Sequence, residues 1–391
     1  MRILKLGLLL LGLVFVIAVV AFFALGPSIV ERRENTFTVH EPYEVSAEAQ
    51  ALHRQLIIAD WHADTLLWKR DFLQRSSRGH VDLPRMQEGN QAIQVFGAVT
   101  KTPAGLNYEE NSADAFDNIT ALAVGQLWPI RTWGSLLERA IYQADKLQEF
   151  AKRSDGQLRV ITNKTELEAA LGDRANGANV TMGLLAVEGA HALEGHLANL
   201  YRLEEAGFRI IGLHHFFDNE LGSSLHGEGE VGLTDFGREV VAEIERRGMV
   251  LDLAHSGPRV AMDALQMSEM PVVVSHTGIF SHCKTKRNFP DPLMKEVANA
   301  GGVVGIGFWA KVTCDDSPKG IAGAIRAAVD LLGDDHVSLG SDWDGTVQVA
   351  MDPSELPALT QALMDAGFSE EQIVKIMGGN FLRIVRERLN P

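Results

Sequence analysis

The chain has little cysteine and fewer basic than acidic residues, and each scarcity excludes a class of protein. Only two cysteines occur among 391 residues, too few for a disulfide-dense scaffold. With 36 Lys and Arg against 51 Asp and Glu, the formal net charge is −15. The chain therefore lacks the basic excess with which proteins bind nucleic acid. We expect small-molecule chemistry and no nucleic-acid partner.

The two cysteines, Cys283 and Cys314, permit one disulfide in an oxidising compartment. Their separation in the sequence does not reveal whether their Cα atoms come within bonding distance. Two unpaired buried thiols are an equally good interpretation. The sequence also lacks a heptad array, a solenoid repeat and a phosphate-binding loop, which excludes coiled coils, repeat proteins and P-loop enzymes.

One long apolar run is present, at the N-terminus. Arg2 and Lys5 precede an uninterrupted apolar stretch from Leu6 to Leu25, about the length that a helix needs to cross a bilayer. A cleaved signal peptide normally has a shorter apolar core, of roughly 7–15 residues. We therefore interpret residues 1–27 as a signal anchor, with a signal peptide as the alternative. The basic end would be cytoplasmic and the remainder outside.

Residues 28–50 are polar and predict a solvated tether between membrane and domain. Residues 51–391 then form one enzymatic domain. A short basic anchor without a glycolipid-attachment tail suggests a bacterial source, and so a membrane-anchored protein whose domain lies in the periplasm. The sequence leaves the oligomeric state open, and a homodimer is possible.

Val- and Ile-rich apolar runs alternate with amphipathic stretches from residue 56 onward, the pattern of repeated βα units. We predict eight strands: 56–62, 92–99, 180–187, 208–214, 249–255, 271–276, 302–308 and 336–341. We predict helices over 240–247, 259–267, 293–300, 321–332 and 355–366, and two short ones within 370–389. Eight parallel strands close a (β/α)8 TIM barrel, so the predicted fold class is α/β.

Residues 101–179 are too long for one βα connection and predict a helical insertion. Its middle places apolar residues at spacings that give one helix face: Leu127, Trp128, Ile130, Trp133, Leu136, Leu137 and Ile141. Packing on the barrel is the simplest interpretation of this face. A substrate-cleft wall and a dimer face are the alternatives.

Several predicted strands end in an acid or a histidine, which is how a parallel barrel builds an active site at one mouth. The residues are His62, Asp64, Glu188, His215, His255, His276 and Asp342. Histidine and carboxylate ligands converging from separate strands indicate a metal-dependent hydrolase, and zinc fits this ligand set best.

The ligand hypothesis depends on the residues together, because each alone has an ordinary explanation. His62 and Asp64 point to one side of a strand end, since alternate residues of a strand share a face, yet such pairs are common in loops. His255 and His276 end consecutive strands and could bind one ion, although a single buried histidine is more often structural. Glu188 could bridge two ions or could be a capping acid.

Seven motifs in order resemble the membrane (renal) dipeptidase family of zinc dipeptidases, which belong to the amidohydrolases and have a TIM-barrel fold. They are DWHAD, EGAH, HHFFDNELG, GLTDFGREVV, LDLAHSG, SHTGIFSHCKTKRNFPD and GSDWDG. The resemblance covers roughly residues 55–388 and explains the insertion and the N-terminal segment least. It implies two zinc ions per chain, one held by His62 and Asp64 and one by His255 and His276, with Glu188 bridging them.

The resemblance also implies how a dipeptide substrate is bound and cut. His215 would contact the scissile carbonyl, although strand alternation alone cannot choose between it and His214. Arg287 would bind the terminal carboxylate, with an exposed basic loop as the alternative. Asp342, rather than Asp344, would carry the proton from the bridging water to the leaving amine.

The expected reaction is attack of a metal-bridging hydroxide on the peptide carbonyl. The chain departs from the commoner family pattern at Trp61, which predicts an altered cleft shape. A related amidohydrolase acting on another amide or a lactam is the enzymatic alternative. A non-catalytic metal-containing binding protein is the third hypothesis, but every expected ligand position is filled.

Overall fold

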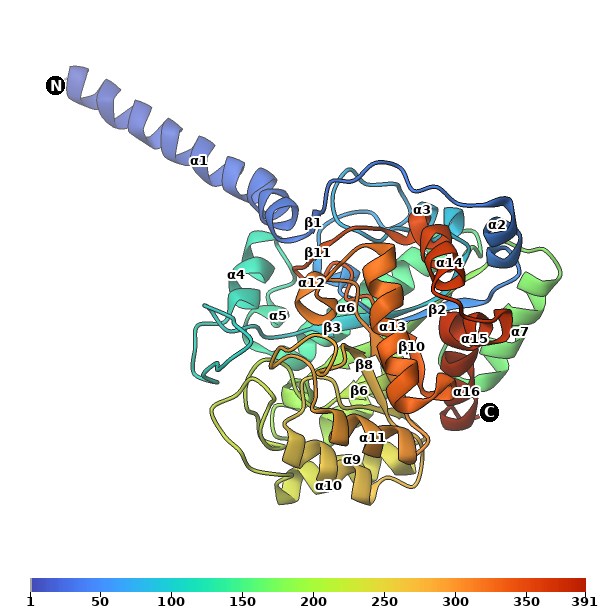
Figure 1. Cartoon of the computed structure of the whole chain (residues 1–391). Helices are drawn as coiled ribbons and strands as arrows, with labels where there is room; N and C mark the ends of the chain where they lie inside the picture. The colour runs from blue at the N-terminus through green and yellow to red at the C-terminus, as the bar shows by residue number, and fades with distance from the viewer. Residues whose placement is uncertain (1) are drawn as a thin grey trace.

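A closed barrel of eight parallel strands forms the centre of the computed structural model, which describes residues 2–391. Figure 1 shows the whole chain. Met1, the first residue of the expected anchor, lies outside the described residues. The strands are β2 (Ile58–Ala63), β3 (Gln91–Val99), β5 (Thr181–Glu188), β6 (Phe208–Gly212), β7 (Val250–Asp252), β8 (Val273–Thr277), β9 (Val303–Ile306) and β10 (Val337–Leu339).

The strands follow the order β3-β2-β10-β9-β8-β7-β6-β5, and β5 pairs back to β3 to close the ring. A short strand, β4 (Leu158–Val160), also pairs with β5. The barrel strands are buried almost throughout, as expected when side chains fill the interior and helices cover the outside. The predicted (β/α)8 barrel is confirmed.

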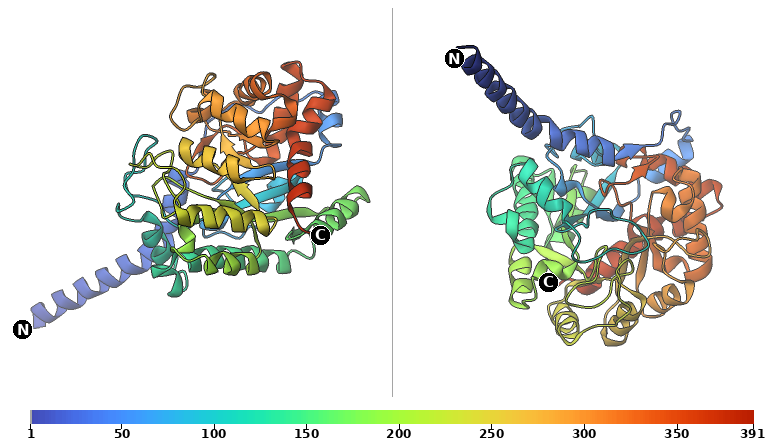
Figure 2. Two further views of the ribbon diagram at one scale, coloured as in Figure 1. Left: turned by 90° about the horizontal axis from the view of Figure 1, so that it is seen from below. Right: turned by 90° about the vertical axis from the view of Figure 1, so that its left-hand side faces the viewer.

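Helices surround the barrel, as Figure 2 shows from two further directions. The predicted helices are α9 (Asp235–Arg246), α10 (Pro258–Met267), α11 (Asp291–Asn299), α13 (Pro318–Leu332), α14 (Leu356–Asp365), α15 (Glu370–Val374) and α16 (Asn380–Arg388). Several begin earlier than predicted because polar caps precede the apolar pattern. Thr234 caps α9 and Ser317 caps α13, each through a side-chain oxygen that accepts a backbone N–H.

The insertion contains α4 (Asn118–Gly125), α5 (Arg131–Gly134), α6 (Leu136–Arg153) and α7 (Lys164–Ala175). α6 packs on the barrel through buried residues such as Leu137 and Leu147. Leu127 and Ile130, by contrast, are 59% and 78% exposed. The predicted packing role therefore holds for only part of the apolar face.

The N-terminal helix α1 (Arg2–Glu34) projects from the domain (Figure 1). Within residues 2–391 it is the one helix long and apolar enough to cross a membrane, judged by length and composition. Part of the expected solvated tether, residues 28–50, docks on the domain. Glu31, in the last turn of α1, is only 1% exposed, and β1 (Thr36–Phe37) pairs in parallel with β11 (Gln348–Val349). Composition cannot reveal this docking, because the partners lie far away in the sequence.

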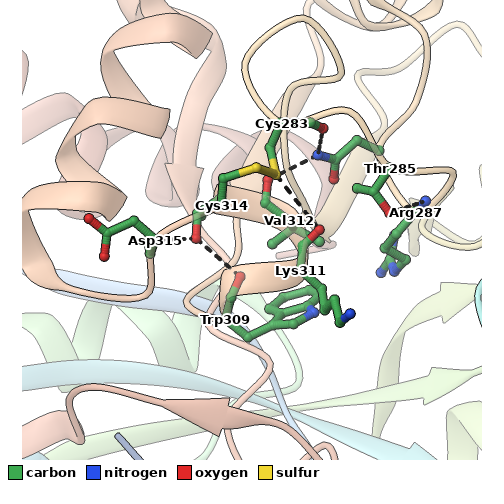
Figure 3. Close-up of a disulfide and its surroundings, with 10 residues drawn as sticks. Cys283, Thr285, Arg287, Trp309, Lys311, Val312, Cys314 and Asp315 are labelled. Carbon is green, nitrogen blue, oxygen red and sulfur yellow. Dashed lines mark hydrogen bonds between the residues drawn. A yellow bond between two sulfur atoms is a disulfide. The ribbon is translucent and has the colours of Figure 1, made fainter.

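Cys283 and Cys314 form a disulfide, with their Cα atoms 5.5 Å apart (Figure 3). The interpretation as two unpaired thiols is therefore wrong. The bond joins the loop after β8 to the C-terminal end of α12 (Ala310–Thr313). It lies close in the chain to Arg287, one of the predicted site residues.

Candidate active site

The C-terminal ends of the barrel strands surround a cavity of about 70 Å³. Seven of the eight predicted site residues line it: Asp64, Glu188, His215, His255, His276, Arg287 and Asp342. The eighth, His62, is buried beside them, with Nε2 3.2 Å from an Asp64 carboxylate oxygen. One cavity thus gathers residues that span most of the chain.

His62 and Asp64 come from the end of β2, where strand alternation sends both side chains toward the barrel axis. Gly97 on the neighbouring β3 makes room for them. A Cβ atom at Gly97 would lie 2.6 Å from Asp64 Oδ1 and 2.7 Å from His62 Cε1. Any other residue at this position would displace the pair.

The Glu188 carboxylate, at the end of β5, is the centre of the cluster. Its Oε1 lies 3.6 Å from Nε2 of His62, 3.2 Å from that of His255 and 3.4 Å from that of His276. Its Oε2 lies 3.5 Å from His215 Nε2. Four imidazoles from four strand ends therefore point the same ring nitrogen at one carboxylate.

His255 and His276 lie at the ends of the consecutive strands β7 and β8, and their Nε2 atoms are 2.9 Å apart. His255 has φ 62, a left-handed conformation uncommon for residues other than glycine and often found at functional sites. The Nδ1 atom of His276 is 2.8 Å from Ser275 Oγ. This contact fixes the ring so that Nε2 faces the cluster.

The residues present fit a divalent metal. Buried atoms without a protein hydrogen-bond partner within residues 2–391 include His62 Nε2, Asp64 Oδ1 and Glu188 Oε2. Such atoms are costly to bury unless something binds them. Three groups of residues bring their ligand atoms within 4.8 Å of one another: His62, Asp64 and Glu188; Glu188, His215 and His255; His62, His276 and Asp342. Imidazole nitrogens and carboxylate oxygens are ligands for zinc and similar ions.

Burial and neighbouring charges shift the pKa of the site's carboxyl groups in opposite directions. Burial raises the pKa of Glu188, but the charges of His215 and His62 outweigh it and hold this pKa well below its usual range. Burial raises the pKa of Asp342 well above its usual range, and Asp64 and Glu188 add to the effect against His62 and Arg287. Glu188 is thus kept ionised, whereas Asp342 is poised to hold a proton.

His215, rather than His214, reaches the cavity. His215 Nδ1 lies 3.1 Å from the carbonyl oxygen of Lys101, which leaves Nε2 facing Glu188. His214 is fully buried, with Nδ1 3.4 Å from Ser256 Oγ. The two neighbouring histidines therefore have different surroundings, a distinction that the sequence alone could not make.

Arg287 differs in exposure from the two lysines that precede it in the same loop. Lys284 and Lys286 are exposed, whereas Arg287 is 1% exposed. Its Nη2 donates to the carbonyl oxygen of His276 at 2.7 Å, and its Nη1 has no hydrogen-bond partner within residues 2–391. The alternative of an exposed basic loop does not describe this residue.

The two aspartates of the loop after β10, Asp342 and Asp344, have different surroundings. Asp342 lines the cavity. The side chain of Asp344 instead accepts hydrogen bonds from Thr65 Oγ1 at 2.7 Å and from the backbone N–H of His80 at 2.6 Å. Asp344 also pairs with Arg70. Its position is that of a structural anchor for the loop.

Several residues at the cavity were missed by the sequence analysis. Leu106 and Tyr108 from the insertion line it, and the Tyr108 hydroxyl accepts a hydrogen bond from Trp309 Nε1 at 3.0 Å. The Tyr108 ring also stacks on Phe216. These residues lie in irregular segments without periodicity, so no pattern in the sequence pointed to them. Part of the insertion is thus a wall of the cavity.

Trp61 does not alter the cleft, contrary to the prediction. Its side chain points away from the barrel axis because it lies between the inward-facing neighbours on β2. It is fully buried and contacts Phe381 on α16, with ring centroids 4.1 Å apart. The departure from the family pattern affects the packing of the outer layer.

Comparison with known proteins agrees with this arrangement. The family model described as membrane dipeptidase (peptidase family M19) matches residues 46–390. Dipeptidase aclJ of Aspergillus oryzae is 29% identical over 380 residues, 90% of this chain and 82% of that protein. Dipeptidase tcpJ of Claviceps purpurea is 28% identical over 324 residues, 79% of this chain and 69% of that protein.

A similar fold is found in a metallo peptidase from Rhodobacter sphaeroides, whose crystal structure holds a phosphinate mimic of the dipeptide L-Ala-D-Ala. The TM-score is 0.70 at 24% identity, over 85% of this chain and 99% of that chain. At this identity the likeness concerns the fold. With the family match over nearly the whole domain and the metal-type cluster at the barrel mouth, the chain belongs to the membrane dipeptidase family, peptidase family M19, and is a hydrolase of the metallo-dipeptidase type.

Proposed function

We propose that the protein is a dizinc dipeptidase that hydrolyses dipeptides with a free terminal carboxylate. The observation that carries this proposal is the Glu188 carboxylate, which faces four imidazoles with Asp64 and Asp342 nearby. His62 and Asp64 would hold one ion, His255 and His276 the other, and Glu188 both. When bound, such a pair supplies a water activated as a nucleophile and polarises the carbonyl.

The protein's own groups then orient the substrate and move the proton. His215 would contact the scissile carbonyl oxygen through Nε2, because Nδ1 faces the Lys101 carbonyl oxygen, and would help to stabilise the charge that develops there. Asp342 would accept the proton from the attacking water and deliver it to the departing amine. Its place on the cavity wall, with its carboxylate near the ring nitrogens of His62 and His276, supports this role.

Arg287 and the size of the cavity support a preference for dipeptides. Arg287 lines the cavity and its Nη1 has no hydrogen-bond partner within residues 2–391, and a fork of donors suits a carboxylate. The cavity is also small, about 70 Å³. In a longer peptide whose N-terminal peptide bond lies at the Glu188 cluster, the terminal carboxylate would be out of reach of Arg287.

We further propose that α1 anchors the enzyme in a membrane with the domain in the bacterial periplasm. The apolar length of α1 supports the anchor, and a disulfide is expected in an oxidising compartment. Phe22 on α1 lies near Gly125, and Leu127 and Ile130, which follow Gly125 closely in the chain, are exposed. These apolar side chains would face the bilayer surface.

A substrate panel tests the proposal. We expect the full-length protein to cleave dipeptides, including L-Ala-D-Ala, and to lose most of its kcat/KM when the carboxylate is amidated or a third residue is added. Equal rates on free and amidated dipeptides would reject the role of Arg287. If the protein hydrolyses lactams or other amides but cleaves no dipeptide, the proposed dipeptidase activity is rejected.

A further inference from the structure

Residues 31–38, which we call the post-helix segment, comprise the last turn of α1 and the strand β1 that follows it, and they contact the loop that carries Asp342. We propose that this segment is a positioning element of the active site and that Glu31 and Asn35 are positioning residues for Asp342. The inference rests on the proposed proton-transfer role of Asp342. It means that the membrane helix and the catalytic loop belong to one rigid unit.

The loop over residues 342–349 needs support from outside, because its backbone is unfavourable by itself. Asp342, Asp344 and Thr346 have φ values of 61, 65 and 59. Non-glycine residues seldom adopt this left-handed region, β-branched ones least of all. Backbone of this kind persists only where the surrounding structure holds it in place.

A buried chain of charges provides the first support. The Arg70 guanidinium pairs with Asp344 and also with Glu31, where Nε is 2.8 Å from Oε1. The second Glu31 oxygen accepts from Arg78 Nε at 2.5 Å. The side chains of Glu31, Arg70 and Asp344 are 1%, 3% and 0% exposed. Removing the charge of Glu31 would leave Arg70 with one carboxylate where it now has two.

The backbone of the loop provides the second contact. Asn35 Oδ1 accepts a hydrogen bond from the Thr346 N–H at 2.9 Å, and the Thr36 N–H donates to the carbonyl oxygen of Val347 at 3.2 Å. From there β1 pairs with β11. His80 connects both supports, since its Nδ1 accepts from the Asp344 N–H at 2.9 Å and its Nε2 lies 3.2 Å from the Thr36 carbonyl oxygen.

These contacts act on the cavity itself. Gly345, Thr346 and Val347 line it together with Asp342. A movement of the loop would therefore displace the proton-transfer group within the cavity. Geometric displacements of about 1 Å can lower a rate by about a hundredfold, so contacts far from the reacting atoms can matter to catalysis.

The test compares Glu31→Gln with the matched control Glu34→Gln in the full-length protein in detergent. Glu34 lies on the same helix end and its side chain is 43% exposed. We expect Glu31→Gln to lower kcat by about ten- to a hundredfold, with KM and metal content unchanged and with a shifted pH profile of kcat. Glu34→Gln should match the parent protein.

Asn35→Ala provides a second test that leaves every charge in place. It should lower kcat in the same way, with KM and metal content again unchanged. An unchanged kcat in both variants would overturn the inference, as would a loss of kcat that merely follows a loss of metal or of folded protein. The variant Asp342→Asn distinguishes a failure of the proposed function from a failure of this inference. If that variant is fully active, the proposed function fails; if it is inactive while Glu31→Gln and Asn35→Ala are active, only this inference fails.

Discussion

Two loops at the barrel mouth carry two of the groups proposed to act on the substrate, Arg287 and Asp342, and these loops are held in different ways. The loop after β8 carries Arg287 and is joined covalently to the end of α12 by the Cys283–Cys314 disulfide (Figure 3). The loop after β10 carries Asp342 and is held by buried ion pairs and backbone hydrogen bonds from the post-helix segment. The disulfide does not titrate, whereas the ion pairs that hold the loop of Asp342 depend on pH.

The difference corresponds to what each loop does. Arg287 needs only to present a permanent positive charge, and a covalent brace some residues away is enough. Asp342 has to exchange a proton at a defined position, and its loop has three left-handed residues. Such a backbone is held by contacts along its length, which a single cross-link could not provide. Each of the following changes affects one of these two loops.

The largest effect is expected from Asp342→Asn. Loss of a general acid or base typically costs a factor of 10²–10⁴, so kcat should fall about a thousandfold while KM and metal content stay near parent values. Steady-state kinetics with metal analysis on the same sample measures this. Activity within about threefold of the parent would show that proton transfer runs through another group.

Removal of the disulfide comes next. For a separation of 31 residues, the chain-entropy relation gives a loss of about 4 kcal/mol in the free energy of unfolding when Cys283 and Cys314 are both changed to serine. KM should rise several-fold because the Arg287 loop loosens, with a smaller change in kcat. Denaturant unfolding and kinetics measure the two parts. A fall in kcat at constant KM would contradict the division between the loops.

Arg287→Ala is expected to lower kcat/KM for dipeptides about a hundredfold, or about 3 kcal/mol, because a buried charge-assisted contact is lost. The loss should appear mainly in KM. Lys286→Ala, an exposed residue of the same loop, is the matched control and should have little effect. Amidated dipeptides should not distinguish the variant from the parent, and a large difference on them would reject carboxylate binding.

The smallest effect is a pH dependence confined to the Asp342 side. Burial lowers the pKa of His80 to about 4, against the charge of Asp344. Below about pH 6.5 the unfolded chain takes up a proton at His80 that the folded protein does not bind until about pH 4. The free energy of unfolding should therefore fall by about 2 kcal/mol from pH 7 to pH 5 on this account.

Replacing His80 by glutamine should remove this contribution to the pH dependence. Urea unfolding of parent and His80→Gln proteins at both pH values isolates it, because all other titrating groups are shared. An identical pH slope in the two proteins would show that His80 is not held neutral.

The barrel could be predicted because strands and helices repeat local patterns that each segment carries by itself. The predicted ligands followed from a rule of parallel barrels, namely that residues such as Glu188 and His276 at strand ends meet at one mouth. These positions needed no knowledge of distant contacts.

The missed features depend on partners far away in the sequence or on an absent side chain. Gly97 matters because it has no Cβ near Asp64, and strand patterns treat glycine only as a weak residue. Tyr108 lies in an irregular loop. Glu31 finds Arg70 and Arg78 only after folding, so the charged cluster at the end of α1 looked like a solvated tether. The disulfide likewise required Cα positions that sequence separation does not give.

Metal stoichiometry with reversible loss of activity tests the central claim most directly. The full-length protein should contain about two zinc ions per chain, lose dipeptide hydrolysis on chelation and regain it when zinc is restored, whereas His255→Ala and Asp64→Ala should each bind less metal. Undiminished hydrolysis by metal-free protein would contradict the account, as would full metal content after the loss of either ligand.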